Sequence, residues 1–341
     1  MRLIKALFAL ILVLAILAGA ALGYGWFWLQ GEVAKPGPSL SETEFTIERG
    51  EGLASVANRL EGEGLVEDQR VLRFQARIDD VESAIKAGSY VIPARASVTD
   101  ILAQLVEGDV IEFRLTIPEG LTTAQILRRV EAAENLTGDL PERTFEEGAL
   151  LPDTYAFGAG TTRTQFLERM EVAQNALLDA LWDDRQDGLP VSTPYEAVIL
   201  ASVVEKETAK AGERPLVAGL FVGRLKKGMR LESDPTIIYG VSGGEPLYNR
   251  QGQRRTLYRS EINRKTDWNT YQIDGLPKTP ICNPGRDAIA AVLNPPETDY
   301  VFFVADGKGG HLFAKTYAEH QRNVAAYRRF EREEIARERE N

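Results

Sequence analysis

The stretch Thr193–Glu207, which reads TPYEAVILASVVEKE, decides the fold of this chain. Its first residues predict a helix N-terminus, because Thr193 can act as N-cap, Pro194 suits the first helical position and Glu196 completes a capping box. The eight residues that follow, Ala197–Val204, include only one polar side chain. A helix that is apolar on every side must be covered by other elements, so we expect this helix to be buried.

Two carboxylates, Glu205 and Glu207, close this helix. Burial raises the pKa of a glutamate, which suits a general acid working at neutral pH. The alternative is a helix end that reaches solvent, where most charged side chains lie. The local pattern does not choose between the two acids. The side of the helix that carries Glu205 also carries the small residues Ala201 and Ser202, so a bulky ligand could approach closely there.

On the C-terminal side, the region from Glu232 to Pro284 is rich in Gly, Asn, Asp, Tyr and Pro. We interpret it as a long, loop-rich surface, and a loop region of this length inside a compact domain is usually functional. Its hydrogen-bonding groups and aromatic rings are compatible with sugar binding. The side chains concerned are Asp234, Tyr239, Asn249, Asn269, Tyr271 and Gln272.

A competing motif lies in the same region. Residues 240–244, GVSGG, match the nucleophile pattern G-x-S-x-G, and Asp306 and His311 follow in the order of an α/β-hydrolase triad. That pattern requires a helix directly after the serine, whereas Gly244-Glu-Pro follows here. We therefore expect Ser242 to be a turn residue.

On the N-terminal side, two short strand–helix units predict a small α+β module over residues 43–110. Its strands are expected at Phe45–Ile47 and Gly88–Ile92, and its last helix ends at Gly108. A strand from Glu112 to Ile117 then opens a larger mixed domain, residues 111–330. A charged tail, residues 331–341, ends the chain. The predicted fold class is therefore α+β.

The first 30 residues predict a membrane anchor. No charged residue occurs from Ala6 to Leu29, and this run is long enough to cross a bilayer as a helix. Arg2 and Lys5 precede it, so the positive-inside rule places the N-terminus in the cytoplasm and the rest of the chain outside. The alternative is a signal peptide cleaved near Ala18-Gly19-Ala20. Residues 31–42, with two prolines and a glycine, are expected to be a linker.

Composition narrows the function classes. The 341 residues carry 40 Lys and Arg against 50 Asp and Glu, a net charge of -10 that argues against a nucleic-acid partner. One cysteine, Cys282, excludes an intrachain disulfide. Two histidines and one cysteine do not make the usual zinc site, and we expect no metal or cofactor.

Several distinctive sequence blocks follow one another along the chain. They are Ile117–Gly120 (IPEG), Leu151–Tyr155 (LPDTY), Ala201–Thr208 (ASVVEKET), Ser233–Thr236 (SDPT), Asn269–Tyr271 (NTY), Asn283–Gly285 (NPG) and Phe303–Gly307 (FVADG). Together these blocks resemble the YceG-like family of endolytic murein (peptidoglycan) transglycosylases. The resemblance covers residues 45–327 approximately, together with the anchor. One difference is Lys278-Thr-Pro-Ile-Cys282, where the family more often has Pro-Gly-Pro-Ile and a small residue.

The resemblance implies a LysM-like module before the catalytic domain, and it implies that Glu205 is the catalytic acid. It also implies cleavage of the β-1,4 bond between N-acetylmuramic acid and N-acetylglucosamine within nascent strands, leaving 1,6-anhydro ends and terminating elongation. Peptidoglycan strands are the expected partner, with peptidoglycan synthases as further candidates, at the inner (cytoplasmic) membrane. Side-chain chemistry and family blocks together suggest six substrate-binding residues: Asp234, Tyr239, Asn269, Tyr271, Glu147 and Tyr155.

Two alternatives remain open from the sequence. One is a non-catalytic peptidoglycan-binding scaffold that acts through the LysM-like module. The other is a hydrolytic muramidase, which would need a second carboxylate, with Asp234 or Asp267 as candidates.

Overall fold

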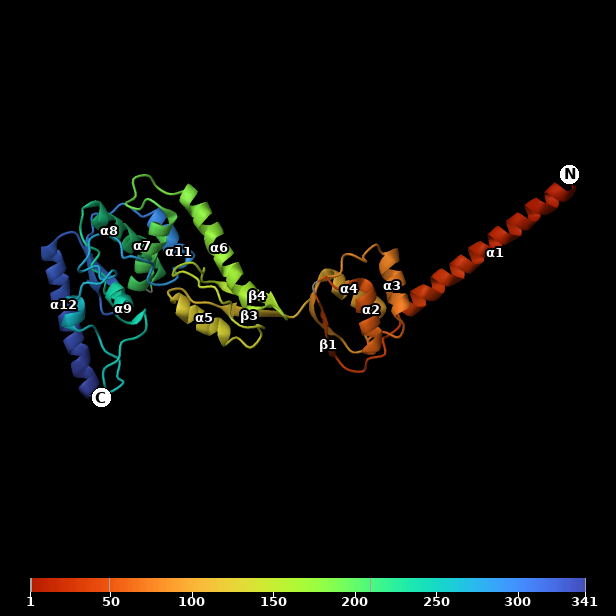
Figure 1. Ribbon diagram of the computed structural model, residues 1–341, viewed down its shortest axis with the longest axis horizontal. Coiled ribbons are helices and arrows are strands. Elements are labelled where there is room, and N and C mark those ends of the chain that lie inside the picture. Colours follow the sequence, from red (N-terminus) through yellow and green to blue (C-terminus); the bar gives the residue numbers. More distant parts are fainter. Residues whose placement is uncertain (1, 49, 209, 341) are drawn as a thin grey trace. The chain divides into compact units, whose positions relative to one another are not determined.

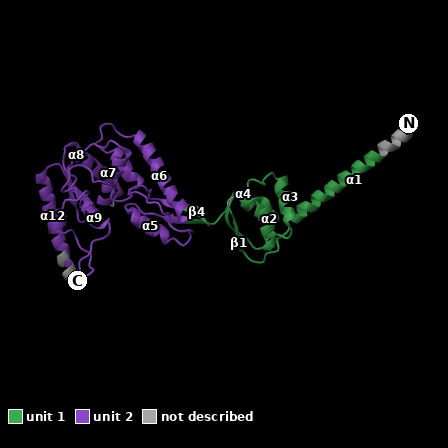
Figure 2. Cartoon of the chain, in the orientation of Figure 1, with its two compact units in different colours: residues 1–113, 156–160 green, residues 114–155, 161–341 purple. Residues whose placement is uncertain are grey.

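The computed structural model describes residues 2–48, 50–208 and 210–340, and they form a mixed α+β structure with three two-stranded sheets (Figure 1). By internal contacts the chain divides into two compact units, coloured in Figure 2. Unit 1 comprises residues 1–113 and 156–160, and unit 2 comprises residues 114–155 and 161–341.

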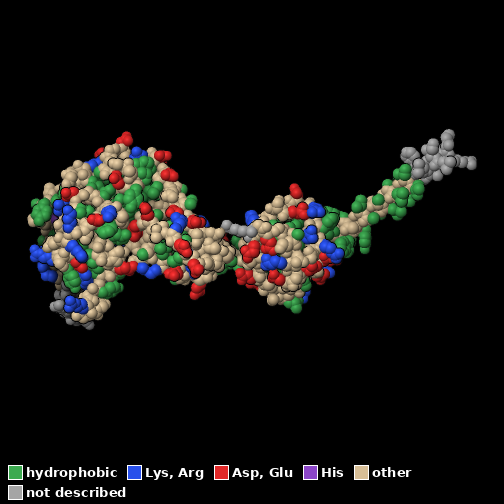
Figure 3. All heavy atoms as spheres, viewed as in Figure 1, with side chains coloured by type: hydrophobic (Ala, Val, Ile, Leu, Met, Phe, Trp, Pro, Cys, Tyr) green, Lys and Arg blue, Asp and Glu red, His purple; other side chains and the backbone are tan. Residues whose placement is uncertain are grey.

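Unit 1 begins with one long helix, α1 (Arg2–Val33), whose segment Leu10–Val33 is long and apolar enough to cross a membrane, with a mean hydropathy of 2.2. Over residues 10–28 its exposed side chains are apolar or aromatic, and they appear in green along the helix in the space-filling view (Figure 3). The charge-free run predicted as the span, Ala6–Leu29, lies within this helix.

The rest of unit 1 is built on one antiparallel strand pair, β1 (Thr43–Ile47) with β2 (Gly88–Ile92). Phe45 lies opposite Tyr90 in the pair, and both side chains are fully buried. The predicted module strands are thus present. Three helices complete its core: α2 (Leu53–Gly62), α3 (Gln69–Ile78) and α4 (Val98–Glu107).

Helix α4 begins after Ser97, which is its N-cap. Its hydroxyl accepts from the Asp100 backbone N–H, and the Asp100 carboxylate accepts from the Ser97 N–H, which is a complete capping box. Gly108 ends the helix with a φ of 75°, a left-handed conformation that glycine adopts without steric cost.

Unit 2 is organised around α7 (Pro194–Glu207), and all eight residues of Ala197–Val204 are buried, as predicted. Helices α8 (Arg214–Lys226) and α11 (Arg286–Leu293) pack against it and against each other. The long helix α6 (Arg163–Asp183) contacts both α7 and α11. Glu205 therefore projects from a helix held on several sides.

The remaining elements frame this core. The strand pair β3 with β4 lies where the division between the units runs, and β5 pairs antiparallel with β6. A short 3-10 helix, Ala211–Glu213, precedes α8. The bounds are β3 (Glu112–Thr116), α5 (Thr123–Glu131), β4 (Thr154–Gly158), α9 (Asp234–Ser242), α10 (Arg259–Ile262), β5 (Phe302–Ala305), β6 (His311–Ala314) and α12 (Tyr317–Glu340).

Two local predictions need correction. Thr193 does cap α7 by accepting from the Glu196 N–H, but the Glu196 carboxylate accepts from the backbone N–H of Ser192 and not of Thr193. The region predicted as loop from Glu232 contains helix α9. The Gly and Pro content of this segment is typical of a loop. In the structure Pro235 lies in the first turn of α9 and Gly243 is its left-handed C-cap.

Candidate active site at the end of helix α7

The Glu205 side chain is almost completely buried, with only 5% of its surface exposed. One carboxylate oxygen, Oε1, accepts from Arg214 Nη2 at 3.1 Å, and Oε2 accepts from the Gly285 backbone N–H at 3.0 Å. Burial raises the pKa of Glu205, the Gly285 hydrogen bond and the Arg214 charge oppose that rise, and Glu119 and Asp287 add to it. The group therefore holds its proton to a higher pH than an ordinary glutamate.

Arg214, at the start of α8, is the cation of this site, and its side chain is 7% exposed. Its Nη2 also donates to Glu119 at 2.9 Å, and its Nη1 contacts Asp287 at 3.4 Å. Three carboxylates thus surround one guanidinium. Since these three acids share a single positive charge, the charge of Arg214 is not available to Glu205 in full.

Glu119 belongs to the turn between β3 and α5, and Gly285 fixes where its carboxylate lies. A Cβ on Gly285 would lie 1.8 Å from Glu119 Oε1, so only glycine leaves room for the acid. The same turn is tied to α7, because Lys206 Nζ donates to the carbonyl oxygen of Gly120 at 3.1 Å. Consecutive residues of α7 therefore bind both the Glu119 turn and the Gly285 loop.

Glu207 occupies a different environment from Glu205. It accepts a hydrogen bond from the Ser233 hydroxyl just before α9, and burial raises its pKa to about 7, with Asp234 adding to the rise. This contact ties the end of α7 to the start of α9. Both acids at the helix end are thus unusually basic, but the Arg214 and Gly285 contacts belong to Glu205.

A second polar cluster lies beside the first and includes two predicted residues. Glu147 Oε2 accepts from the Tyr239 hydroxyl at 3.1 Å, and Oε1 accepts from the backbone N–H of Thr123 and from Asn283 Nδ2. Burial raises the pKa of Glu147 and of Tyr239. The Tyr239 ring packs edge-on against Trp268, with 5.7 Å between centroids.

The loop 281–285 connects the two clusters. Asn283 is fully buried, and its side chain bonds Glu147 while its backbone exchanges hydrogen bonds with the segment Gly120–Leu121. Two residues later, Gly285 donates to Glu205. Glu147 and Glu205 are therefore held by one short loop.

The other predicted substrate-binding residues divide into two kinds. The Tyr271 hydroxyl donates to Asp234 Oδ1 at 2.9 Å, which brings this pair together beside Ser233. Asn269 is fully buried, and its amide donates to the carbonyls of Glu261, Ile262 and Arg264, so it organises a loop. Tyr155 is buried, donates to the Leu151 carbonyl and packs edge-on against Phe166.

Asp267, a candidate for the second carboxylate of a muramidase, forms an ion pair with Lys278.

The hydrolase triad does not form. Ser242 ends α9, and its hydroxyl lies within hydrogen-bond distance of the Ile238 and Glu245 carbonyl oxygens. The His311 ring contacts Glu213 at 2.8 Å, while the Asp306 carboxylate accepts from the backbone N–H groups of Lys308 and Gly310. The prediction that Ser242 is a turn residue is wrong by one position, because Ser242 is the last residue of α9 and the turn begins at Gly243.

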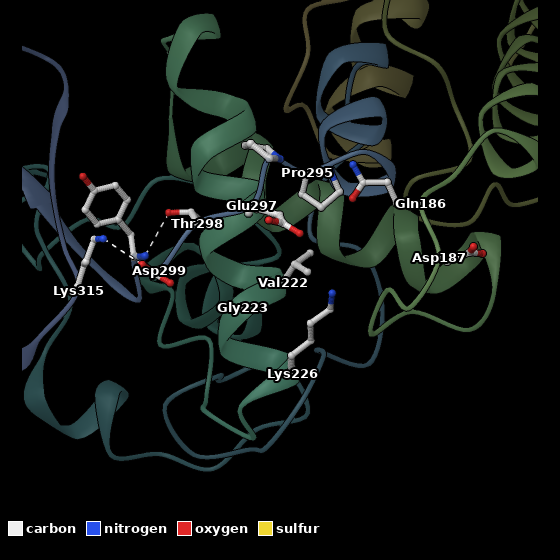
Figure 4. A pocket seen from close by; sticks show the side chains of 13 residues that line it. Gln186, Asp187, Val222, Gly223, Lys226, Pro295, Glu297, Thr298, Asp299 and Lys315 are labelled. Atoms are coloured by element: carbon white, nitrogen blue, oxygen red, sulfur yellow. Dashed lines mark hydrogen bonds and ion pairs between the residues drawn. The ribbon is translucent and has the colours of Figure 1, made fainter.

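Unit 2 has two cavities whose lining residues do not include Glu205. One of about 260 Å³ is lined by Glu147 and Tyr195, among others. The other, of about 670 Å³, runs along the side of α8 toward its C-terminal end, between Gln186, Lys226 and Lys315 (Figure 4). No predicted site residue is among the residues that line this larger cavity. Its size does not make it the site of chemistry, since the buried acids lie at the end of α7.

Arg214, Glu119, Asp287 and the amide of Gly285 were missed as functional groups by the sequence reasoning. IPEG and NPG stood out only as family blocks, with no role for their residues. The one local signal for Arg214 was an arginine nine residues after Glu205, just inside a Pro-initiated helix.

A buried carboxylate with raised pKa, held by a guanidinium and a backbone N–H, is an arrangement suited to general acid–base chemistry. The profile of the YceG-like family matches residues 45–326, and the chain belongs to that family. Proteins from two Streptococcus pneumoniae strains, each named endolytic murein transglycosylase, are 29% identical to it over 327 residues. These alignments cover 82% of this chain and 57% of the relatives, so the chain spans a little over half their length.

A Bacillus subtilis protein with the same name is 24% identical over 319 residues, covering 85% of this chain and 86% of that protein. A crystal structure of a yceG-like protein from Listeria monocytogenes is 24% identical. It covers 83% of this chain and 98% of that one, with a TM-score of 0.49.

Proposed function

We propose that this protein is an endolytic murein transglycosylase in which Glu205 performs both proton transfers. The observation that carries the proposal is that the buried carboxylate of Glu205 accepts hydrogen bonds from Arg214 and from the Gly285 N–H. The names of the pneumococcal and Bacillus relatives supply the substrate class, peptidoglycan, and the reaction type, a lyase.

In the first step Glu205 is the general acid. Its raised pKa lets it hold a proton to a higher pH than an ordinary glutamate does, and it gives this proton to the glycosidic oxygen as the C1–O bond of N-acetylmuramic acid breaks. The substrate's own acetamido group stabilises the developing positive charge at C1, as in other substrate-assisted glycosidases.

In the second step the ionised Glu205 is the base. It takes the proton of the muramic acid O6 hydroxyl while O6 bonds to C1, which closes the 1,6-anhydro ring and restores the protonated acid. No water is consumed. The hydrogen bonds from Arg214 and Gly285 occupy both oxygens of Glu205, which is how an ionised carboxylate is stabilised between the two steps.

We further propose that Glu147, Tyr239, Asp234 and Tyr271 contact the glycan strand. They form two hydrogen-bonded pairs, Glu147 with Tyr239 and Asp234 with Tyr271. The first pair is linked to Glu205 through the loop 281–285, and the second lies next to Ser233, which donates to Glu207. The buried Asn269 and Tyr155 instead hold the loops that present these groups.

The domain assignment is part of the proposal. Residues 1–30 form a cytoplasmic tip and membrane anchor, 31–42 a connection, 43–110 a LysM-like module, 111–330 the catalytic domain and 331–341 a charged tail. Arg2 and Lys5, which precede the apolar segment of α1, support an N-terminus in the cytoplasm, with the catalytic domain on the outer side of the cytoplasmic membrane, where peptidoglycan synthases are candidate partners.

The test compares Glu205→Gln with Glu207→Gln on purified protein and peptidoglycan strands, with the products read by mass spectrometry. Glu205→Gln should lower strand cleavage at least about a hundredfold, because it removes the acid–base group. Glu207→Gln should retain cleavage, because that carboxylate faces Ser233. Full activity of Glu205→Gln would refute the assignment.

The same products separate the two alternatives. New ends that are reducing sugars would identify a muramidase. If the wild type binds peptidoglycan strands but does not cleave them, and Glu205→Gln still binds them, the protein is a scaffold.

A further inference from the structure

The anchor helix does not end at a flexible tether but enters the core of unit 1. Leu29 and Val33, in the last turns of α1, are buried together with Leu72 and Ala76 of α3. The Thr99 hydroxyl donates to the Val33 carbonyl at 3.2 Å. After the helix, the chain stays attached to unit 1, because the Gly37 N–H donates to the Arg95 carbonyl. The position of α3 relative to α1 is therefore fixed.

An apolar groove of about 360 Å³ lies between these two helices. Phe74 and Ile78 of α3 form one wall, and their side chains are 56% and 38% exposed. The other wall belongs to α1: Ala21, Leu22, Gly25, Trp26, Trp28 and Leu29. Every residue that lines the groove is apolar or aromatic, which is unusual for a surface that faces water.

The depth of the groove along α1 indicates what covers it. Ala21 lies eight residues before Leu29, which is about 12 Å along a helix at 1.5 Å per residue. Ala21–Gly25 therefore lies inside the charge-free run that would cross the bilayer. Phe74 and Ile78 line the same groove, so they lie beside the end of the charge-free run that is nearest to the core of unit 1.

Helix α3 has the pattern of a helix lying at a membrane surface. Phe74 and Ile78 are about 40° apart around the helix and point away from the buried Leu72 and Ala76. Arg70 and Arg77 flank them, and each already has a surface partner, in Asp68 and Glu82. The apolar pair supplies the contact, while long arginine side chains can extend to headgroup phosphates.

We propose that α3 rests in the surface of the bilayer that α1 spans, with Phe74 and Ile78 among the lipids and an acyl chain of a phospholipid in the groove. This inference rests on the membrane anchoring proposed above. The partner is the lipid of the leaflet that faces unit 1, because the groove continues the apolar surface of the anchor itself.

The experiment uses the full chain in phospholipid bilayers with single cysteines at Phe74 or Ile78, each labelled with an environment-sensitive fluorophore. The native Cys282 is fully buried, so labelling is confined to the new site, and the unsubstituted protein measures any background. Quenching is measured with lipids that carry a nitroxide near the top of the acyl chain, and with a water-soluble quencher. Val172→Cys, exposed on α6, is the aqueous control, and Leu17→Cys in α1 is the lipid control.

The expected result is that labels at 74 and 78 are quenched by the lipid nitroxide at least twice as strongly as the label at 172, and are protected from the aqueous quencher. Labels at 74 and 78 that behave like the label at 172, while the label at 17 is quenched in the lipid, would overturn the inference and leave the anchoring intact. An aqueous response at 17 as well would refute both.

Discussion

The charge of Glu119 should determine the pH range in which Glu205 can act as an acid. Oxygens of both carboxylates contact the same Arg214 nitrogen, at 2.9 and 3.1 Å. They are therefore no more than about 6 Å apart, where Coulomb's law gives roughly 0.7 kcal/mol in water and roughly 2.8 kcal/mol at an effective dielectric constant of 20. Glu119 is 41% exposed, which favours the lower part of this range, on the order of 1 kcal/mol.

Glu119→Gln removes this repulsion. The ionised form of Glu205 then becomes more favourable, its pKa falls, and the acid form is lost at a lower pH. At a pH above the alkaline limb of the wild-type profile, kcat/KM should fall about fivefold, the equivalent of 1 kcal/mol, while kcat/KM well below the limb stays the same.

Gly285→Ala provides an independent route to the same effect. The new Cβ would occupy the position of the Glu119 carboxylate and displace it from Arg214, while the extended backbone of Gly285, with φ of -76°, accepts alanine. Both variants should move the alkaline limb in the same direction. Cleavage of strands is measured across pH, with unfolding curves to confirm intact protein. An unmoved limb in both folded variants would refute the role of Glu119.

Three further outcomes follow from buried groups of unit 2. Because the pKa of Glu207 is about 7 when folded against 4.5 when unfolded, its contribution to the unfolding free energy falls by up to roughly 3 kcal/mol as the pH rises through that window. Glu207→Gln should remove this slope in urea titrations, and an equal slope in both proteins would contradict it. Asn283→Ala should lower the unfolding free energy by about 2 to 4 kcal/mol, because it leaves the buried Leu150 N–H without its acceptor, whereas the exposed Asn175→Ala should change little. Burial raises the pKa of Cys282 far above its usual range, so a thiol reagent should react with it only in denaturant, and rapid reaction of the folded protein would show the site to be open.

The sequence predicted what depends on neighbours along the chain. The cap at Thr193 and the uniformly apolar run after it were enough to identify α7 and its burial. The strands of unit 1 and the Gly108 helix end were likewise found from local patterns. Helix α9 was missed because its glycine and proline content resembles that of a loop.

The groups around Glu205 could not be found in this way. Glu119 and Arg214 are 95 residues apart, and Glu205 and Gly285 are 80 apart, so no periodicity links them. The local sequence pattern also could not distinguish Glu205 from Glu207, since both lie in the last turn of the same buried helix. The asymmetry between them comes from the loops and helices that pack on either side.

These long separations have a consequence for when the site comes into existence. A chain that leaves the ribosome in order presents Glu205 before Gly285 and Asp287, so the carboxylate has neither its amide donor nor its full set of charged neighbours until residue 287 has emerged. Contacts this distant also form late in folding, after the loops between them have closed. A site assembled in this way is absent from nascent chains, and it arises only in a domain that has finished folding.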